Sequence, residues 1–338
     1  MSDQPPPPAT DPAQTHETAK WKHDRPLIAC RFEPTGKFVF SGAEDFNICR
    51  WELATGKMLR FGGHDSWVRA IGFSPDGKTL YSGGYDGKLC WQPALAEENP
   101  QPSRTVAAHA GWLRALAVSL DGSRVVTCGN DNLVKLWNTD NGELVHTFAG
   151  HGSHVYNVVF HPSGQFVISC DLKGNIKQWD CGEGKHVRDF AAAALYKYDT
   201  QFRADIGGAR GMAFAADGKR FAVAGVTNVS NAFAGIGNPC VVVFDWETGQ
   251  AVKTHTAKEA VNGVAWGVRL HPAGYVFAQS GGGAGGYFYF WKPEEEKEFF
   301  RFKLPASGRD CDLHPDGRQV AVAHADTHVR LYLLDKKG

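Results

Sequence analysis

The chain has 338 residues, which is long enough for two average domains or for one large one. Hydrophobic residues make up 43% of the sequence and charged residues 21%, a balance that is typical of a soluble globular protein and excludes disorder over most of the chain. Lys plus Arg equals Asp plus Glu at 36 each, so no overall basic field would attract nucleic acid or an anionic membrane.

The first 14 residues, MSDQPPPPATDPAQ, are rich in proline and contain no hydrophobic signal core. We expect residues 1–14 to be a disordered tail. No stretch approaches the roughly 18 consecutive apolar residues of a membrane span. The eight cysteines form no C-x-x-C pair, which favours small core residues over disulfides or metal ligands. The sequence therefore predicts a cytoplasmic protein.

A turn signal recurs seven times along the rest of the chain. Tripeptides such as PTG, PDG and PSG each stand between two short apolar stretches, and a Gly in this context is typical of a β-hairpin. The turn glycines are Gly36, Gly77, Gly122, Gly164, Gly218, Gly274 and Gly317. Each turn predicts two antiparallel strands.

An aromatic residue follows each turn glycine and gives the same count. In four units the distance is 15 residues. The aromatic anchors are Trp51, Trp91, Trp137, Trp179, Phe244, Trp291 and Tyr332. A period of about 40 residues with four strands per unit is typical of a β-propeller. We therefore predict an all-β, seven-bladed propeller.

Residues 63–91, GHDSWVRAIGFSPDGKTLYSGGYDGKLCW, resemble a WD40 repeat from end to end. Residues 108–137 and 150–180 are nearly as close, whereas units 5 to 7 keep little of the signature. The resemblance implies one WD40 propeller over residues 15–338. It also implies that residues near 15–21 supply the outer strand of blade 7 and so close the ring, which removes an exposed sheet edge.

Two successive units contain a histidine, a hydroxyl, a carboxylate and a tryptophan at equivalent positions. The sets are His64, Ser82, Asp86 and Trp91, then His109, Thr127, Asp131 and Trp137. A hydrolytic triad is one interpretation, but an enzyme would need such a set only once. The resemblance implies a buried structural network instead. Blade 4 has Lys173 in the carboxylate position, and blade 1 offers a further set, namely His23, Ser41, Asp45 and Trp51.

Other signals of catalysis or cofactor binding are weak. Residues 281–286, GGGAGG, satisfy G-x-G-x-x-G, but an apolar strand follows instead of the helix that a dinucleotide site needs. Turn histidines such as His161, His271 and His314 lack metal-ligand spacing. We predict no enzyme activity, no catalytic residues, no cofactor and no metal.

The resemblance places two classes of loop on one face, called the top: those between strands b and c of a blade, and those between successive blades. Three irregular loops fall there, at residues 191–208, 226–239 and 281–286. We interpret them as a binding lip, with tolerated insertion as the alternative. Residues 96–103 of blade 2 are an excursion expected on the opposite face.

Aligned first strands place large side chains at one position of several blades. These are Arg69, Arg114, Tyr156, Arg210 and Arg309, with Asn262 as the expected equivalent in blade 6, and Trp67, Trp112 and His154 two residues earlier. In the resembling family these positions ring the channel mouth and often touch ligands. Arginines beside aromatics suit an acidic or phosphorylated peptide. Alternatively, each Arg pairs with a loop carboxylate such as Asp86 or Asp131 and binds nothing.

The sequence therefore predicts a protein-binding or peptide-binding scaffold that uses its top face. The alternative is a propeller enzyme or a small-molecule-binding protein acting at the channel mouth. We expect a protein partner, no nucleic acid and no membrane, and a chain that is monomeric by itself.

Overall fold

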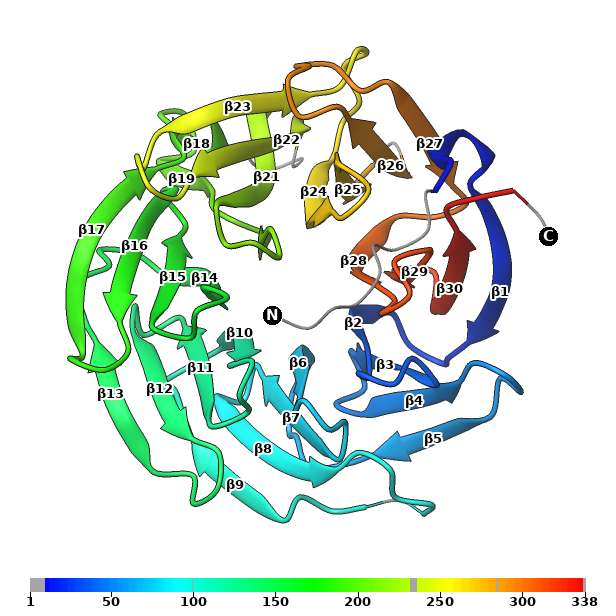
Figure 1. Cartoon of the computed structure of the whole chain (residues 1–338), viewed down its shortest axis with the longest axis vertical. Coiled ribbons are helices and arrows are strands. Elements are labelled where there is room, and N and C mark those ends of the chain that lie inside the picture. The colour runs from blue at the N-terminus through cyan, green and yellow to red at the C-terminus, as the bar shows by residue number, and fades with distance from the viewer. Residues whose placement is uncertain (1–9, 99, 232–235, 284, 337–338) are drawn as a thin grey trace.

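The computed structural model describes residues 10–98, 100–231, 236–283 and 285–336. They form seven four-stranded antiparallel sheets arranged as blades around a central channel (Figure 1). The predicted seven-bladed β-propeller is confirmed. Within this part of the chain the helical elements are two 3-10 turns, η1 (Pro12–Gln14) and η2 (Ala193–Leu195), so no helix there has the length or hydrophobicity of a membrane span.

Blades 1 to 4 are regular and follow one another along the chain. Blade 1 consists of β2 (Leu27–Phe32), β3 (Phe38–Ala43), β4 (Ile48–Glu52) and β5 (Met58–Phe61). Blade 2 consists of β6 (Val68–Phe73), β7 (Thr79–Gly84), β8 (Lys88–Pro93) and β9 (Arg104–Ala107). Blade 3 consists of β10 (Leu113–Val118), β11 (Arg124–Gly129), β12 (Val134–Asn138) and β13 (Leu144–Phe148). Blade 4 consists of β14 (Val155–Phe160), β15 (Phe166–Asp171), β16 (Asn175–Asp180) and β17 (Lys185–Ala191).

Blades 5 to 7 complete the ring, and an extra hairpin of β18 (Tyr196–Asp199) and β19 (Ala204–Gly207) precedes them. Blade 5 consists of β20 (Gly211–Phe214), β21 (Arg220–Asn231), β22 (Ile236–Asp245) and β23 (Ala251–Thr256). Blade 6 consists of β24 (Val264–His271), β25 (Tyr275–Gly281), β26 (Gly286–Trp291) and β27 (Phe300–Leu304). Blade 7 consists of β28 (Gly308–Leu313), β29 (Gln319–His324), β30 (His328–Leu333) and β1 (His16–Lys22).

The repeat features identified in the sequence have direct structural roles. All seven turn glycines have positive φ, between 71° and 86°, a conformation that side chains of other residues disfavour. All seven aromatic anchors are 5% exposed or less. Seven of the eight cysteines are buried and none forms a disulfide, as expected for small core residues.

The N-terminal strand closes the ring, as the resemblance implied. β1 pairs antiparallel with β30 as the outermost strand of blade 7. The side chain of Trp21 in β1 stacks on Trp51 of blade 1, with ring centroids 6.2 Å apart, so β1 also joins the last blade to the first.

Residues 10–14 were predicted to belong to a disordered tail, and this prediction is wrong. Pro12 is buried in η1, and Thr10 Oγ1 lies 2.9 Å from the hydroxyl of Tyr275, so local packing orders this segment. Residues 1–9, the rest of the expected tail, lie outside the described residues.

A second junction between blades 7 and 1 lies on the channel wall. Asp310 and Asp312 of β28 accept hydrogen bonds from the backbone N–H groups of β2, at 3.1 Å from Cys30 and 3.0 Å from Phe32. Arg31 Nη1 lies 2.7 Å from Asp310 Oδ2, and Arg269 of blade 6 forms an ion pair with Asp312. The two carboxylates therefore hold blades 6, 7 and 1 together from inside.

The turn histidines are structural, in agreement with their lack of ligand spacing. The Nε2 atoms of His161, His271 and His314 each lie close to the carbonyl oxygen of the next blade's turn glycine, at 3.2, 2.7 and 2.9 Å. Each ring thus links the a-to-b turns of two neighbouring blades.

Candidate binding site at the channel mouth

The histidine, hydroxyl, carboxylate and tryptophan set of blade 3 forms a closed network. His109 Nδ1 lies 2.8 Å from Asp131 and its Nε2 lies 2.8 Å from Thr127 Oγ1, which also accepts a 2.9 Å hydrogen bond from Trp137 Nε1. Burial lowers the pKa of His109. Burial alone would raise the pKa of Asp131, but hydrogen bonds from His109 and from backbone amides lower it. The Thr127 side chain is fully buried, and its hydroxyl is bonded to both His109 and Trp137.

Blade 2 departs from the expected network at its tryptophan. His64 lies 3.1 Å from Asp86 and 2.9 Å from Ser82. Trp91, however, donates its indole hydrogen to the backbone oxygen of Thr139, at 2.9 Å, instead of joining this set. The prediction for Trp91 is wrong because the side chain reaches blade 3, where it serves as a link between blades.

Blade 4 has a complete network, although Lys173 occupies the expected carboxylate position. Asp171, two residues earlier, lies 3.2 Å from His151 Nδ1. Ser169 bonds both His151 and Trp179, at 2.7 and 2.8 Å. A carboxylate at the end of β15 can thus replace one in the following turn.

In blade 1 the expected set forms two separate pairs. His23 Nε2 lies 2.9 Å from Asp45 Oδ2, and Trp51 Nε1 donates to Ser41 at 3.0 Å. The second ring nitrogen of His23 lies 3.5 Å from the sulfur of Cys49, which takes the place that the serine has in blade 4.

Removing the Thr127 hydroxyl tests the structural role of the network. We expect Thr127→Val to lower the free energy of unfolding by about 2–3 kcal/mol, because the indole of Trp137 and the imidazole of His109 both lose a buried partner. The exposed Thr147 of the same blade provides the matched control. Thr147→Val should change stability by less than about 0.5 kcal/mol. Equal midpoints of chemical denaturation for the two variants would show that the network contributes nothing.

The predicted ring of large side chains corresponds to one structural position. Strand a of blades 2, 3, 4 and 7 has a bulge near its start, and the bulged residues are Arg69, Arg114, Tyr156 and Arg309. In blade 5 the equivalent is Arg210, whose N–H bonds to Ala224 at the same end of the strand. In blade 6 the bulged residue is Trp266, and the expectation of Asn262 is wrong. The extra residues of blade 6 lengthen β24 and do not precede it.

Five of these side chains and their neighbours line a cavity of about 370 Å³ in the channel. The guanidinium carbon of Arg114 lies 4.6 Å from the ring centroid of Trp112 and 4.4 Å from that of Tyr156. The Arg210 guanidinium lies 4.3 Å from Tyr156 and 5.4 Å from Trp266. Arginines and aromatic rings therefore alternate from blade 3 to blade 6, an arrangement held by cation–π contacts.

The aromatic series continues onto the surface of blades 2 and 3. Trp67 and Trp112 are 37% and 43% exposed, and Tyr85 stacks between them with centroid distances of 5.9 and 4.2 Å. Tyr85 was not predicted from the sequence, although its place beside Asp86 in a top-face turn was a usable signal. His154 is exposed and lies 2.7 Å from the backbone oxygen of Asn130.

Arg309 differs from the other three predicted arginines. It lies 3.4 Å from Glu44 of blade 1 and is absent from the cavity lining. Pairing with a loop carboxylate, the structural alternative, is therefore found for Arg309. The carboxylates named for that alternative, Asp86 and Asp131, instead bind His64 and His109.

The remaining three arginines have few anionic partners. Arg69 donates to the backbone oxygen of Ile28 at 2.5 Å and lies 3.6 Å from Asp310, which also pairs with Arg31. Arg114 donates to the neutral side chain of Asn130 at 2.7 Å.

Arg210 is the least compensated of the three. In the described part of the chain neither Arg114 nor Arg210 forms a salt bridge, and the buried Nε of Arg210 has no hydrogen-bond partner there. Burial lowers the pKa of Arg210, interaction with Tyr156 partly offsets this effect, and the charges of Arg114 and Arg69 add to the lowering.

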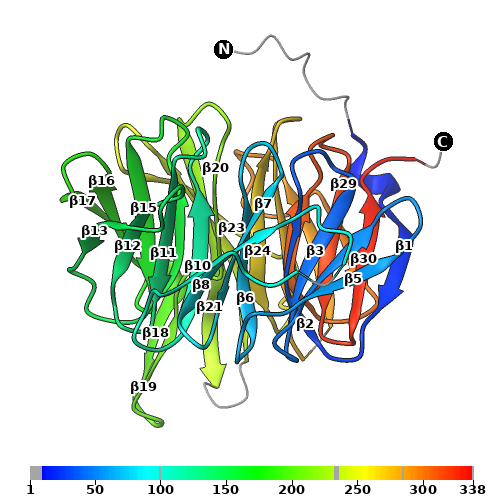
Figure 2. The ribbon, with the colours of Figure 1, turned by 90° about the horizontal axis from the view of Figure 1, so that it is seen from below.

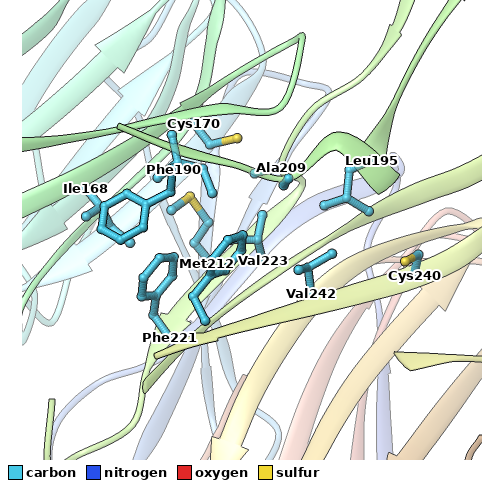
Figure 3. Close-up of a cluster of buried hydrophobic side chains, with 13 residues drawn as sticks. Ile168, Cys170, Phe190, Leu195, Ala209, Met212, Phe221, Val223, Cys240 and Val242 are labelled. Carbon is cyan, nitrogen blue, oxygen red and sulfur yellow. The ribbon is translucent and has the colours of Figure 1, made fainter. Parts of the chain in front are cut away.

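Two of the three irregular loops form a wall at blade 5. The β18–β19 hairpin and the outer part of β21–β22 protrude from the same side of the ring (Figure 2). Lys197 Nζ donates to the backbone oxygen of Val229 at 2.5 Å, and Asn238 bonds the backbone of Val261 at 3.2 Å. Leu195 and Ala209, which flank the hairpin, are buried in the core between blades 4 and 5 (Figure 3). Hydrogen bonds therefore join the two loops of this wall to each other and to Val261, and buried side chains anchor the hairpin in the core.

The other loop predictions have mixed outcomes. Residues 281–286 connect β25 to β26, and the strand that follows excludes the helix of a dinucleotide site. Residues 232–235 of the blade 5 loop and residue 99 of the blade 2 excursion lie outside the described residues. Among the residues that are described, no group of three or more His, Cys, Asp or Glu side chains could hold a metal ion.

The seven closed blades define the chain as a β-propeller, and the repeats specify its family. The family model of the WD domain, G-beta repeat, matches residues 17–52, 56–91, 100–138 and 142–180. A comparison with curated proteins found no match. The matches run from β1 to β16 and so include strands a to c of blades 1 to 4, in line with the fading of the signature in units 5 to 7. The chain is a seven-bladed β-propeller with WD40 repeats in four places.

Proposed function

We propose that this propeller is a non-catalytic scaffold that binds an acidic or phosphorylated segment of another protein at the top of the channel. WD40 propellers commonly serve as interaction scaffolds. The observation that carries the proposal is the alternation of Arg114, Tyr156, Arg210 and Trp266 at a cavity whose lining has more arginines than carboxylates, with the exposed Trp67 and Trp112 nearby.

The chemistry of these side chains supports an anionic peptide. Guanidinium groups form paired hydrogen bonds with carboxylates and phosphates, and each charge-assisted bond contributes about 1.5–3 kcal/mol. Exposed tryptophans supply apolar contact area at low entropic cost, which is typical of binding hot spots. The wall of blade 5 would limit the paths by which an extended segment enters the mouth.

Affinity capture with matched variants tests the proposal. The baits are wild type, the triple variant R69Q/R114Q/R210Q, and R309Q as a control that changes the same repeat position outside the cavity. We expect wild type and R309Q to retain a common protein from the source lysate, with less retained at higher salt because exposed charges are screened. The triple variant should lose it while unfolding at a similar temperature. Retention of the same protein by all three baits would refute the proposal.

A small-molecule-binding protein is the second candidate, and the cavity volume favours it. About 370 Å³ lies in the range of small-ligand pockets. This candidate gains support if no bait captures a protein and anionic metabolites raise the thermal unfolding midpoint of wild type but not of the triple variant.

A further inference from the structure

The charges around the channel cavity do not balance. Its lining includes five arginines and one carboxylate: Arg31, Arg69, Arg114, Arg210, Arg269 and Asp310. Arg31 pairs with Asp310, and Arg269 with Asp312 on the adjacent strand. Arg69 shares Asp310 with Arg31, at 3.6 Å, and within the described residues Arg114 and Arg210 form no salt bridge. Three positive charges are therefore left without a carboxylate of their own there, in a partly enclosed space where repulsion between like charges is weakly screened.

The three unbalanced arginines are close together. The guanidinium carbons of Arg114 and Arg210 both lie within 4.4 Å of the Tyr156 ring centroid, so they are separated by no more than twice that distance, about 9 Å. The guanidinium carbons of Arg210 and Arg69 lie 5.4 and 5.9 Å from the ring centroid of Trp266. The buried, unpartnered Nε of Arg210 leaves one donor in this group unused.

We propose that this cavity is a phosphate-binding site, formed by Arg69, Arg114 and Arg210. The inference rests on the proposed function and narrows its ligand. A carboxylate carries one charge and two oxygens in a plane. A phosphate monoester carries a charge of about −1.5 to −2 and three strong acceptor oxygens in a tetrahedral arrangement. It can therefore accept from guanidinium groups that approach from different sides, and its charge offsets more of the local excess.

The phosphate has two possible sources, a phosphorylated side chain of a partner or a free phosphate ion. Titration calorimetry of the full chain with sodium orthophosphate at constant ionic strength tests the shared chemistry, with sodium acetate as the carboxylate control. We expect saturable phosphate binding that R210Q weakens by about tenfold or more, because it removes a charge-assisted donor. R309Q should bind like wild type, and acetate should bind more weakly than phosphate. R114Q replaces R210Q if the latter does not fold.

A peptide library with a fixed central residue and random flanks distinguishes the two sources. Retention of the protein on the phosphoserine library above the serine and glutamate libraries, with competition by orthophosphate, assigns the site to a phosphorylated segment. Orthophosphate binding without such retention assigns it to the free ion.

The inference is overturned if neither orthophosphate nor the phosphoserine library binds better than its carboxylate counterpart. The proposed function survives that outcome if the glutamate library binds wild type and not R210Q. Conversely, orthophosphate binding without any captured protein would support the site and refute the scaffold.

Discussion

A variant that begins at His23, and therefore lacks β1, is expected to lose the cooperative unfolding transition of the full chain and to aggregate. Its strand β30 would expose an unpaired edge along His328–Leu333. The stack of Trp21 on Trp51 and the ion pair between Glu17 and Arg330, 3.3 Å long, would also be lost. Trp21→Ala alone should lower the free energy of unfolding by about 2–4 kcal/mol, less than for a fully buried tryptophan because Trp21 is half-buried.

Adding the missing segment as a separate peptide tests whether the truncated protein is unstable because it lacks β1 or because the rest of the chain misfolds. The segment Thr10–Lys22, added to the truncated protein, should restore the thermal transition in a concentration-dependent way, because binding to the folded state alone stabilises it. The same peptide with Trp21→Ala should restore less. An unchanged unfolding midpoint for the truncated protein would show that β1 does not close the ring.

Asp310→Asn is expected to lower the free energy of unfolding by about 3 kcal/mol. Asparagine can still accept the N–H of Cys30, but Arg31 loses the negative charge that balances it on the channel wall. Breaking one partner of a buried ion pair typically costs about 3–5 kcal/mol. The lower end of this range applies because Arg31, the charge left unpaired, is 33% exposed and stays partly solvated, although Asp310 is only 5% exposed.

A surface pair with the same chemistry serves as the control for this variant. Asp24 and Arg60 form an exposed ion pair at 2.5 Å, and exposed pairs contribute little because water and salt screen them. Asp24→Asn should therefore leave the denaturation midpoint unchanged. If Asp310→Asn also leaves it unchanged, the inner junction of blades 7 and 1 carries no stability.

The fold could be predicted from the sequence because it depends on local features that repeat. Each turn needs a glycine with positive φ, and each blade needs a large buried anchor, so the same residue types recur at a fixed spacing. Closure by β1 was predicted from the resemblance to WD40 repeats. The inner junction at Asp310 and Asp312 has no such periodic signal, because it occurs once and depends on which strands become neighbours across the ring.

The candidate site was predicted only in part because its details depend on geometry that spacing does not encode. Counting residues suggested Asn262, but the position of a bulge decides that Trp266 faces the channel. Aligned spacing treated Arg309 like Arg210, but Arg309 lies 3.4 Å from Glu44 across the blade junction, whereas Arg210 forms no salt bridge with a described residue. Asp171 replaced the expected carboxylate near Lys173 because a side chain can turn back from a different residue of the same strand end.

We propose that three arginines at the channel mouth, Arg69, Arg114 and Arg210, bind an anionic ligand and that Arg309 does not. The most direct measurement is the affinity of the captured partner segment for R69Q, R114Q, R210Q and R309Q, each at low and at physiological salt. We predict that the first three variants bind about tenfold more weakly and with a reduced salt dependence, whereas R309Q binds like wild type. Equal affinities for all four variants, or a loss confined to R309Q, would contradict the account.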